Sequence, residues 1–215
     1  MRTTVDDHRE LLNEVAEWRL LSMLFDCPRN DWYGEVKALG KAVHDTTLKK
    51  AARNAVKEGS DSLFHSVFGP GGPAPGREVS YRGWVQPGYM LSEISAFYNA
   101  FSFSPDTQEP PDHVAVETGF IAYLKLKQLY ALECEDIESF SIAKKASDDF
   151  IDEHLSKFTA QLAKILRVSG IEFLSLAGKA LLDRVGPDKD NRLDRFLPVV
   201  ESNEEEMSEF ECGVT

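Results

Sequence analysis

An aspartate, a histidine and a glutamate lie close together near the middle of the chain, and their side-chain types could carry chemistry. Asp112 and His113 are adjacent, and Glu117 follows His113 by four residues, about one helical turn. An Asp–His pair can do acid–base work, and a His–Glu pair at this spacing can hold part of a metal site. A structural interpretation is also open, in which Pro111 starts a helix, Asp112 favours its positive end and His113 packs or caps there.

The sequence around these residues does not contain the other groups that catalysis usually needs. A catalytic zinc needs a third ligand, and the other histidines (His8, His44, His65 and His154) follow no ligand pattern. No Ser or Cys lies in an activating motif, and no glycine-rich loop has phosphate-binding spacing. We keep one enzymatic alternative, a metal-dependent hydrolase that uses His113, Glu117 and His154. Otherwise the sequence favours a protein that is not an enzyme and that holds neither a metal nor a cofactor.

Two predicted helices and a rigid loop position Asp112 and His113. Apolar residues recur with helical spacing from Met90 to Phe101, and again after His113 as far as Leu132. The segment 102–111 between them is rich in proline and acid, and it cannot continue the first helix. An aromatic cluster flanks this loop; it consists of Phe97, Tyr98, Phe101, Phe103 and Phe120. These rings either pack in the core or, in part, line a groove for an apolar peptide segment.

The rest of the chain also shows helical periodicity. The expected helices are 7–25, 32–39, 45–57, 61–68, 139–168 and 171–185. The run Gly69-Pro-Gly-Gly-Pro-Ala-Pro-Gly76 can hold neither a helix nor a central strand, so it must be a surface connection. Helices on both sides favour a long loop within one domain over a domain boundary. Large aromatic residues in the irregular part that follows, Tyr81 and Trp84 among them, either pack back on the core or contact a partner.

No segment alternates apolar and polar residues for long enough to form a sheet. The predicted fold is therefore all-α, a single-domain bundle of about seven or eight helices that occupies residues 1–198. Residues 199–215 are acidic and poor in apolar side chains, and we expect them to be a disordered tail.

Composition and charge restrict the function classes. The formal net charge is −12, which disfavours binding to nucleic acid and suits either a basic partner or simple solubility. The three cysteines are scattered, which suggests neither a disulfide framework nor a structural metal site. The polar N-terminus does not look like a signal peptide, and no apolar run approaches membrane-spanning length. We expect a cytoplasmic protein with no direct insertion into the membrane.

The central motifs resemble a known family. The pattern Glu93-x4-Tyr98-x2-Phe101-Ser-Phe103, followed by Glu109-Pro-Pro-Asp-His113 and an acidic-apolar helix, is similar to the signature of redox-enzyme maturation chaperones of the TorD/DmsD/NarJ type. Further pieces match in order: a first helix that ends at Cys27-Pro28, a loop start at Val79-Ser-Tyr81, and a later Phe150-x3-His154. Ser102 stands where the family usually has glycine.

The resemblance implies a non-enzymatic, all-helical, cytoplasmic chaperone. Such proteins bind the twin-arginine signal peptide, or the N-terminal segment, of a molybdopterin oxidoreductase catalytic subunit and assist cofactor insertion before export. The residues expected to contact that peptide are Asp112, His113, Glu117, Glu109, Tyr98, Phe101, Tyr81 and Trp84. The resemblance also implies a monomer or a domain-swapped dimer, with Gly69–Gly76 as a plausible hinge. A purely structural helical adaptor remains the other alternative.

Overall fold

The computed structural model describes residues 2–83, 85–186 and 188, with side chains from residue 7 onward. Within these residues the secondary structure is helical, and an isolated antiparallel bridge joins Arg77 to His113. The helices are α1 (Arg2–Leu24), α2 (Trp32–Ala42), α3 (Thr46–Glu58), α4 (Asp61–Phe68), η1 (Glu78–Ser80), α5 (Pro87–Ala100), α6 (Val114–Glu133), α7 (Ile137–Phe150), η2 (Ile151–Leu155), α8 (Ser156–Val168) and α9 (Glu172–Val185). Because η2 joins α7 to α8 without a break, we count these three as one continuous helix. Apart from the short turn η1, the described residues then form eight helices, which confirms the predicted all-α class.

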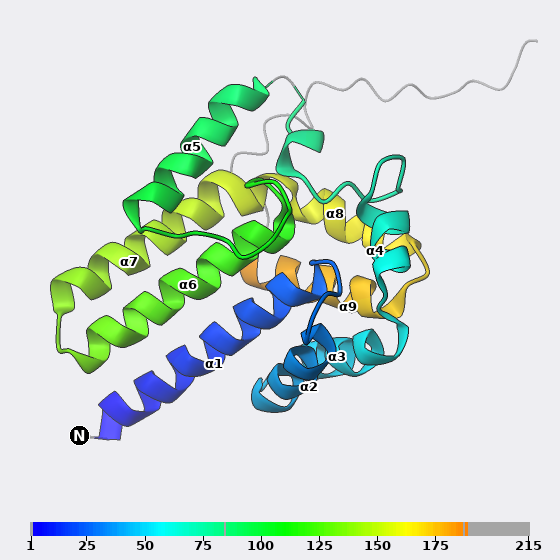
Figure 1. The fold of residues 1–215 in the computed structure, drawn as a ribbon. Coiled ribbons are helices and arrows are strands. Elements are labelled where there is room, and N and C mark those ends of the chain that lie inside the picture. Colours follow the sequence, from blue (N-terminus) through cyan, green and yellow to red (C-terminus); the bar gives the residue numbers. More distant parts are fainter. Residues whose placement is uncertain (1, 84, 187, 189–215) are drawn as a thin grey trace, which may run out of the picture.

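The helices form one domain with a shared core. Helix α1 packs along α6, and α6 in turn packs against α7, while α9 contacts both α3 and α8 (Figure 1). Helix α5 and the loop that follows it lie across the α6–α7 layer (Figure 1). The largest fully buried side chains include Phe25, Phe120, Phe150 and Phe158, which come from segments far apart in the sequence. No helix in the described residues is both long and apolar enough to span a membrane.

Several helix boundaries follow from capping residues. Asp45 accepts hydrogen bonds from the backbone of Thr47 and Leu48 at the start of α3, and Ser60 caps α4 in the same way. Asp136 caps α7, so this helix begins at Ile137 and not at Ser139 as predicted. Helix α1 likewise begins earlier than predicted, at Arg2, and α5 begins at Pro87.

The long helix predicted over residues 139–168 is continuous, but it changes type in the middle. Residues Ile151–Leu155 form a π-helical turn between α7 and α8, and this turn buries His154 and Leu155. A π-turn inserts extra backbone into a helix and rotates the faces that follow it, and such turns are frequent at functional sites. The apolar pattern runs unbroken through this segment, so the π-turn could not be predicted from it.

Two connections shape the region before α6. The Gly69–Gly76 segment is a loop within the domain, tied back by a hydrogen bond from Ala74 N to Val67 O (3.1 Å). At the end of α5, Ser102 has φ +55°, in the left-handed region where glycine is favoured. The resemblance implies a glycine at this position, and the left-handed backbone agrees with that expectation. The predicted tail, residues 199–215, lies outside the described residues.

Candidate functional site

Asp112 and His113 lie where two loops meet. The backbone N–H of Glu78 donates to Asp112 O (2.8 Å), and the N–H of Val114 donates to Gly76 O (2.8 Å). These two bonds fasten residues 76–78 to residues 112–114 and hold the start of α6. We call the buried polar residues gathered here, Glu78, Asp112, His113, Glu117 and His154, the acidic corner.

Asp112 is fully buried and forms an ion pair with Arg77. The Nε of Arg77 lies 2.9 Å from Oδ1, its terminal nitrogen lies 2.9 Å from the same oxygen, and the backbone N–H of Val79 donates to Oδ2 (3.3 Å). The Arg77 side chain is 40% exposed, so this pair joins the interior to the surface. Asp112 therefore anchors the loop before η1 to the loop before α6, and its carboxylate does not face solvent.

His113 is the N-cap of α6, which corrects the prediction that the helix starts at Pro111. Its Nδ1 accepts a hydrogen bond from the backbone N–H of Ala115 (3.3 Å), which places the ring proton on Nε2. Burial, and then the charge of Arg77, lowers the pKa of His113 to about 4, so the ring is neutral at pH 7. A Cβ at position 76 would lie 2.0 Å from Nε2, so only glycine fits there. The capping interpretation of His113 is confirmed.

Glu117 is fully buried beside a second acid that sequence analysis did not single out. Neither oxygen of Glu117 makes a hydrogen bond of ordinary geometry within the described residues. Burial, followed by the nearby charges of Glu78 and Asp112, raises the pKa of Glu117 well above its usual value. The raised pKa favours the neutral form of Glu117, in which its carboxyl group can lie beside that of Glu78 in the core.

Glu78 links the acidic corner to the π-turn. Its carboxylate accepts a hydrogen bond from Arg82 (2.5 Å), and its other oxygen lies 3.0 Å from Nδ1 of His154. The ring of His154 packs against Phe150, four residues earlier, at a centroid distance of 4.8 Å. The π-turn thus places a buried histidine against a buried glutamate that lies 76 residues earlier in the chain.

The predicted aromatic contact residues mostly serve as packing. Tyr98 is buried and donates to Pro111 O (2.9 Å), which ties α5 to the loop before α6. Tyr81 donates to Pro75 O (2.7 Å) and stacks on Phe158. Phe101 is half-buried and packs near Phe120, with a centroid distance of 6.2 Å. Core packing of the aromatic cluster is confirmed, and Trp84 lies outside the described residues.

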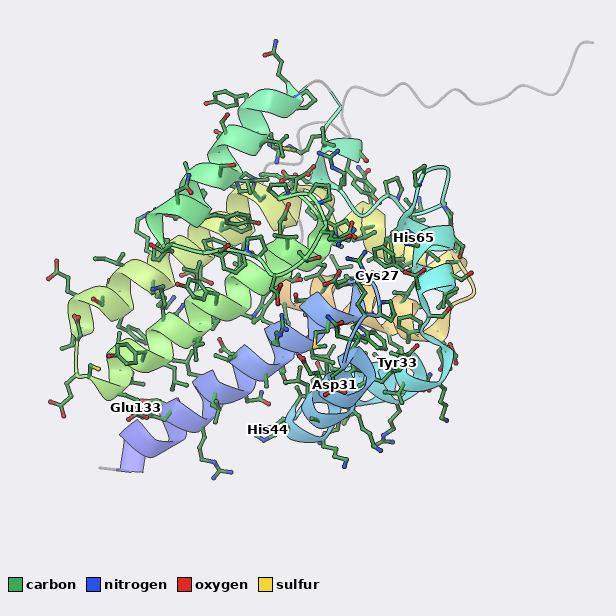
Figure 2. All side chains as sticks on the ribbon, in the orientation of Figure 1. Cys27, Asp31, Tyr33, His44, His65 and Glu133 are labelled. Carbon is green, nitrogen blue, oxygen red and sulfur yellow. The ribbon has the colours of Figure 1, made fainter. Side chains whose placement is uncertain are left out.

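An open cleft of about 340 Å³ lies beside the same loop, between residues 105–108 and the connection from α1 to α2. We call it the loop cleft. Its acidic lining residues are Asp26, Asp31, Glu35 and Asp106, and Arg19 and Arg29 also line it. Figure 2 labels Cys27 and Asp31 on the side of the cleft formed by that connection. Thr107 donates to Asp26 across the cleft (3.2 Å), so the two walls are joined.

Glu109 occupies the space between the loop cleft and the acidic corner. One carboxylate oxygen lies 3.9 Å from an Arg29 nitrogen, and the other lies 4.0 Å from Nε2 of His113. Partial burial, and then the charge of Asp26, raises the pKa of Glu109. Burial also raises the pKa of Asp26. The charge of Arg29 lowers both pKa values, but burial outweighs it at each of the two carboxyl groups.

Comparison with known proteins identifies the family. The sequence profile described as nitrate reductase delta subunit matches residues 33–164, more than half of the chain. The chain belongs to this family. It is also 32% identical over 83 residues to the selenate reductase assembly chaperone protein of Thauera selenatis. That match covers 37% of this chain and 42% of the relative, so it spans less than half of the relative's length. No solved structure matches at a significant level.

Family membership confirms the resemblance to redox-enzyme maturation chaperones and points to a non-enzymatic protein. The geometry also contradicts the hydrolase alternative. Within the described residues, the side chains close enough to share a metal ion are Cys27, Asp61 and His65, not His113, Glu117 and His154. His113 instead approaches Glu109, and His154 faces Glu78. The hydrolase alternative is therefore wrong.

The residues that sequence reasoning missed lie just before the predicted loop start at Val79. Arg77 and Glu78 looked like ordinary charged loop residues, although each contributes to the acidic corner. A buried carboxylate at Asp112 needs a cation to pair with it, but the sequence did not show that Asp112 is buried or which cation pairs with it. Its location was not readable, because 35 residues separate Arg77 from Asp112.

Proposed function

We propose that this chain is a cytoplasmic assembly chaperone for a molybdopterin-containing oxidoreductase. It binds the twin-arginine signal peptide, or another N-terminal segment, of the catalytic subunit and assists cofactor insertion before export. Family membership and the name of the Thauera selenatis relative support an assembly role for a reductase. The observation that carries the peptide-binding part is the loop cleft beside Glu109.

The charge of the cleft suits an arginine-rich peptide. Asp26 and Glu109 both have raised pKa values because burial disfavours their ionised forms, and Glu109 also lies near the charge of Asp26. A guanidinium group that entered between them would stabilise both carboxylates and could bind one of them through two parallel hydrogen bonds. Binding should therefore release protons and become tighter as the pH rises through the raised pKa values.

The apolar part of such a peptide needs an apolar surface beside the acids. Phe101, Phe103 and Pro105 are half-buried at the loop that forms one wall of the cleft, so part of each side chain is open to contact. A basic segment in the cleft followed by an apolar segment over this loop matches the order of charges and apolar residues in a twin-arginine leader.

The buried motif residues act in this proposal by holding the loop. Asp112, His113 and Glu117 are 0%, 3% and 0% exposed. In this proposal they hold Glu109 and the loop in place and do not contact the peptide themselves. Tyr81 and Tyr98 also hold the loops in place, through their hydrogen bonds to the carbonyl oxygens of Pro75 and Pro111. Trp84 stays a prediction from the sequence.

Isothermal titration calorimetry of the full chain tests the proposal. We expect a leader peptide with two adjacent arginines to bind at least tenfold more tightly than the same peptide with two lysines or with a scrambled order. Glu109→Gln and Asp26→Asn should weaken binding, while Glu138→Gln, a control for an exposed acid on α7, should not. Equal affinity for all peptides would overturn the proposal. Variants that change thermal stability but not peptide binding would favour the structural adaptor.

A further inference from the structure

Three side chains that suit a metal ion lie together outside the acidic corner. The Sγ of Cys27, a carboxylate oxygen of Asp61 and an imidazole nitrogen of His65 all lie within 4.8 Å of one another. Sγ is 2.9 Å from Oδ1 of Asp61, and Nε2 of His65 is 3.4 Å from the same oxygen. In a tetrahedral site with bonds of about 2.0 to 2.3 Å, neighbouring ligand atoms are about 3.3 to 3.8 Å apart. Two of the separations, 2.9 and 3.4 Å, are close to that spacing, and the third is no longer than 4.8 Å, so small side-chain movements would bring the three atoms to it.

The fold brings these residues together from two segments. Asp61 and His65 occupy positions i and i+4 of α4, so their side chains share one face of the helix. Ser60 caps α4 and fixes where that face begins. Cys27 is 3% exposed and belongs to the connection after α1, and its backbone N–H donates to Asp26 (2.8 Å). Figure 2 labels Cys27 and His65 on these two neighbouring segments.

We propose that Cys27, Asp61 and His65 bind one divalent transition-metal ion of the zinc type. A thiolate, an imidazole and a carboxylate are the ligand types that zinc uses, whereas magnesium and calcium prefer oxygen alone. Three protein ligands leave a fourth position for water. Cys27 also lines the loop cleft, but the metal site is built from Cys27, Asp61 and His65 and is tested by metal titration without any peptide, so the proposal does not depend on peptide binding.

The surroundings explain what the ion must displace. In the metal-free chain the thiol of Cys27 donates to Asp61, and burial followed by this hydrogen bond raises the pKa of Cys27 to about 11. A metal ion therefore has to release the thiol proton, and its affinity should rise with pH. The Arg29 guanidinium lies close enough to act on the same thiol, so it opposes the added positive charge.

Binding would join α4 to the connection between α1 and α2. Phe64 and Phe68 of the same helix pack on the ring of His113, at centroid distances of 6.1 and 6.0 Å. An ion at Cys27 would therefore stabilise the helix against which the N-cap of α6 rests. This predicts a metal-dependent increase in thermal stability, in proportion to the logarithm of the free metal concentration above the Kd.

Titration of the full-length, metal-stripped chain with Co²⁺, a spectroscopic substitute for zinc, tests the site. We expect one ion per chain, a thiolate-to-cobalt charge-transfer band, and loss of that band when Zn²⁺ is added. Cys27→Ser should abolish the band, and His65→Gln and Asp61→Asn should each weaken binding at least tenfold. Cys134→Ser and Cys212→Ser remove the other two thiols and should leave the band unchanged.

His65 and Asp61 are exposed, with side chains 54% and 66% accessible, so their variants will fold even if Cys27→Ser does not. A band that persists in His65→Gln and Asp61→Asn, or that disappears in Cys212→Ser, would assign the metal elsewhere and overturn the proposal. Absence of any band in the natural chain would overturn it as well. A zinc-dependent rise in melting temperature that is present in the natural chain and lost in His65→Gln would support it.

Discussion

The acidic corner and the loop cleft both gather carboxylates around the segment from Phe101 to His113, but they differ in their access to water. In the corner, Asp112 and Glu117 are fully buried; Asp112 is paired with Arg77, and burial raises the pKa of Glu117 and so favours its neutral form. In the cleft, Asp31 and Asp106 are exposed. A buried charge that is already paired determines where a loop lies, whereas an exposed one is free to meet a ligand. The difference separates residues that build the site from residues that can contact a partner.

The largest effect should come from breaking the corner at Asp112. Asp112→Ala leaves Arg77 without its partner and the N–H of Val79 without its acceptor, so we expect a loss of about 3 kcal/mol in the free energy of unfolding. Urea denaturation followed by circular dichroism measures it. Asp183→Ala removes an exposed ion pair with Lys179 on α9 and should change stability little. Similar losses in both variants would show that Asp112 has no special structural role.

His113 should give the corner a stability that depends on pH. Its folded-state pKa is about 4, against about 6.5 in an unfolded chain, so the unfolded state binds more protons between these values. The contribution is therefore present above pH 6.5 and lost as the pH falls towards 4, and it amounts to about 3 kcal/mol. His113→Gln should flatten the stability profile in this window, and the exposed His44→Gln should not. Two profiles of equal slope would contradict the burial of a neutral ring.

Glu117 should act in the opposite direction. Its pKa is raised in the folded state, so the folded chain binds more protons above about pH 4.5, and the contribution is lost as the pH rises through the folded-state pKa. Glu117→Gln mimics the protonated form and should gain stability relative to the natural chain with rising pH, by at most about 1.4 kcal/mol per pH unit. Glu93→Gln is the exposed control on α5. A constant difference between Glu117→Gln and the natural chain at all pH values would argue against a protonated Glu117.

Changes in the cleft should have the smallest effect on stability. Asp31→Asn and Asp106→Asn alter exposed side chains, so we expect the free energy of unfolding to stay within about 0.5 kcal/mol. The same variants should weaken binding of an arginine-rich peptide, and high salt should reduce the difference because exposed charges are screened. Calorimetry at two salt concentrations measures this. A clear fall in stability would show that Asp31 and Asp106 have a structural role like that of the acidic corner, and it would contradict the distinction between the two regions.

The local features of the fold were readable from the sequence, because they depend on neighbouring residues. Periodic apolar positions gave the helices, and Gly59 and the Gly69–Gly76 run marked where they end. The sequence indicated that a capped helix begins near residue 112, but not the residue at which it begins. We expected the helix to start at Pro111, whereas His113 is its N-cap. The π-turn at Ile151–Leu155 was not readable, because a regular helix and a π-turn can carry the same apolar pattern.

The candidate site was readable only in part. The motif from Glu109 to Glu117 indicated the correct family, but the burial of its residues depends on which distant residues cover them. Arg77 and Asp112 meet across 35 residues, and Cys27 meets Asp61 across 34. Such pairs leave no periodic trace in the chain. The prediction that Asp112 and His113 contact a peptide therefore stays a prediction, while their role in holding the loop follows from their contacts.

The ties between residues 76–78 and 112–114 have a consequence for motion. They close a loop that contains η1, α5 and the segment before α6, so these elements are held at both ends by the same few bonds. We expect them to open as one cooperative unit, with amide protons from Glu78 to Val114 exchanging together in a hydrogen-exchange experiment. Opening would bring Asp112, His113 and Glu117 to the surface at once.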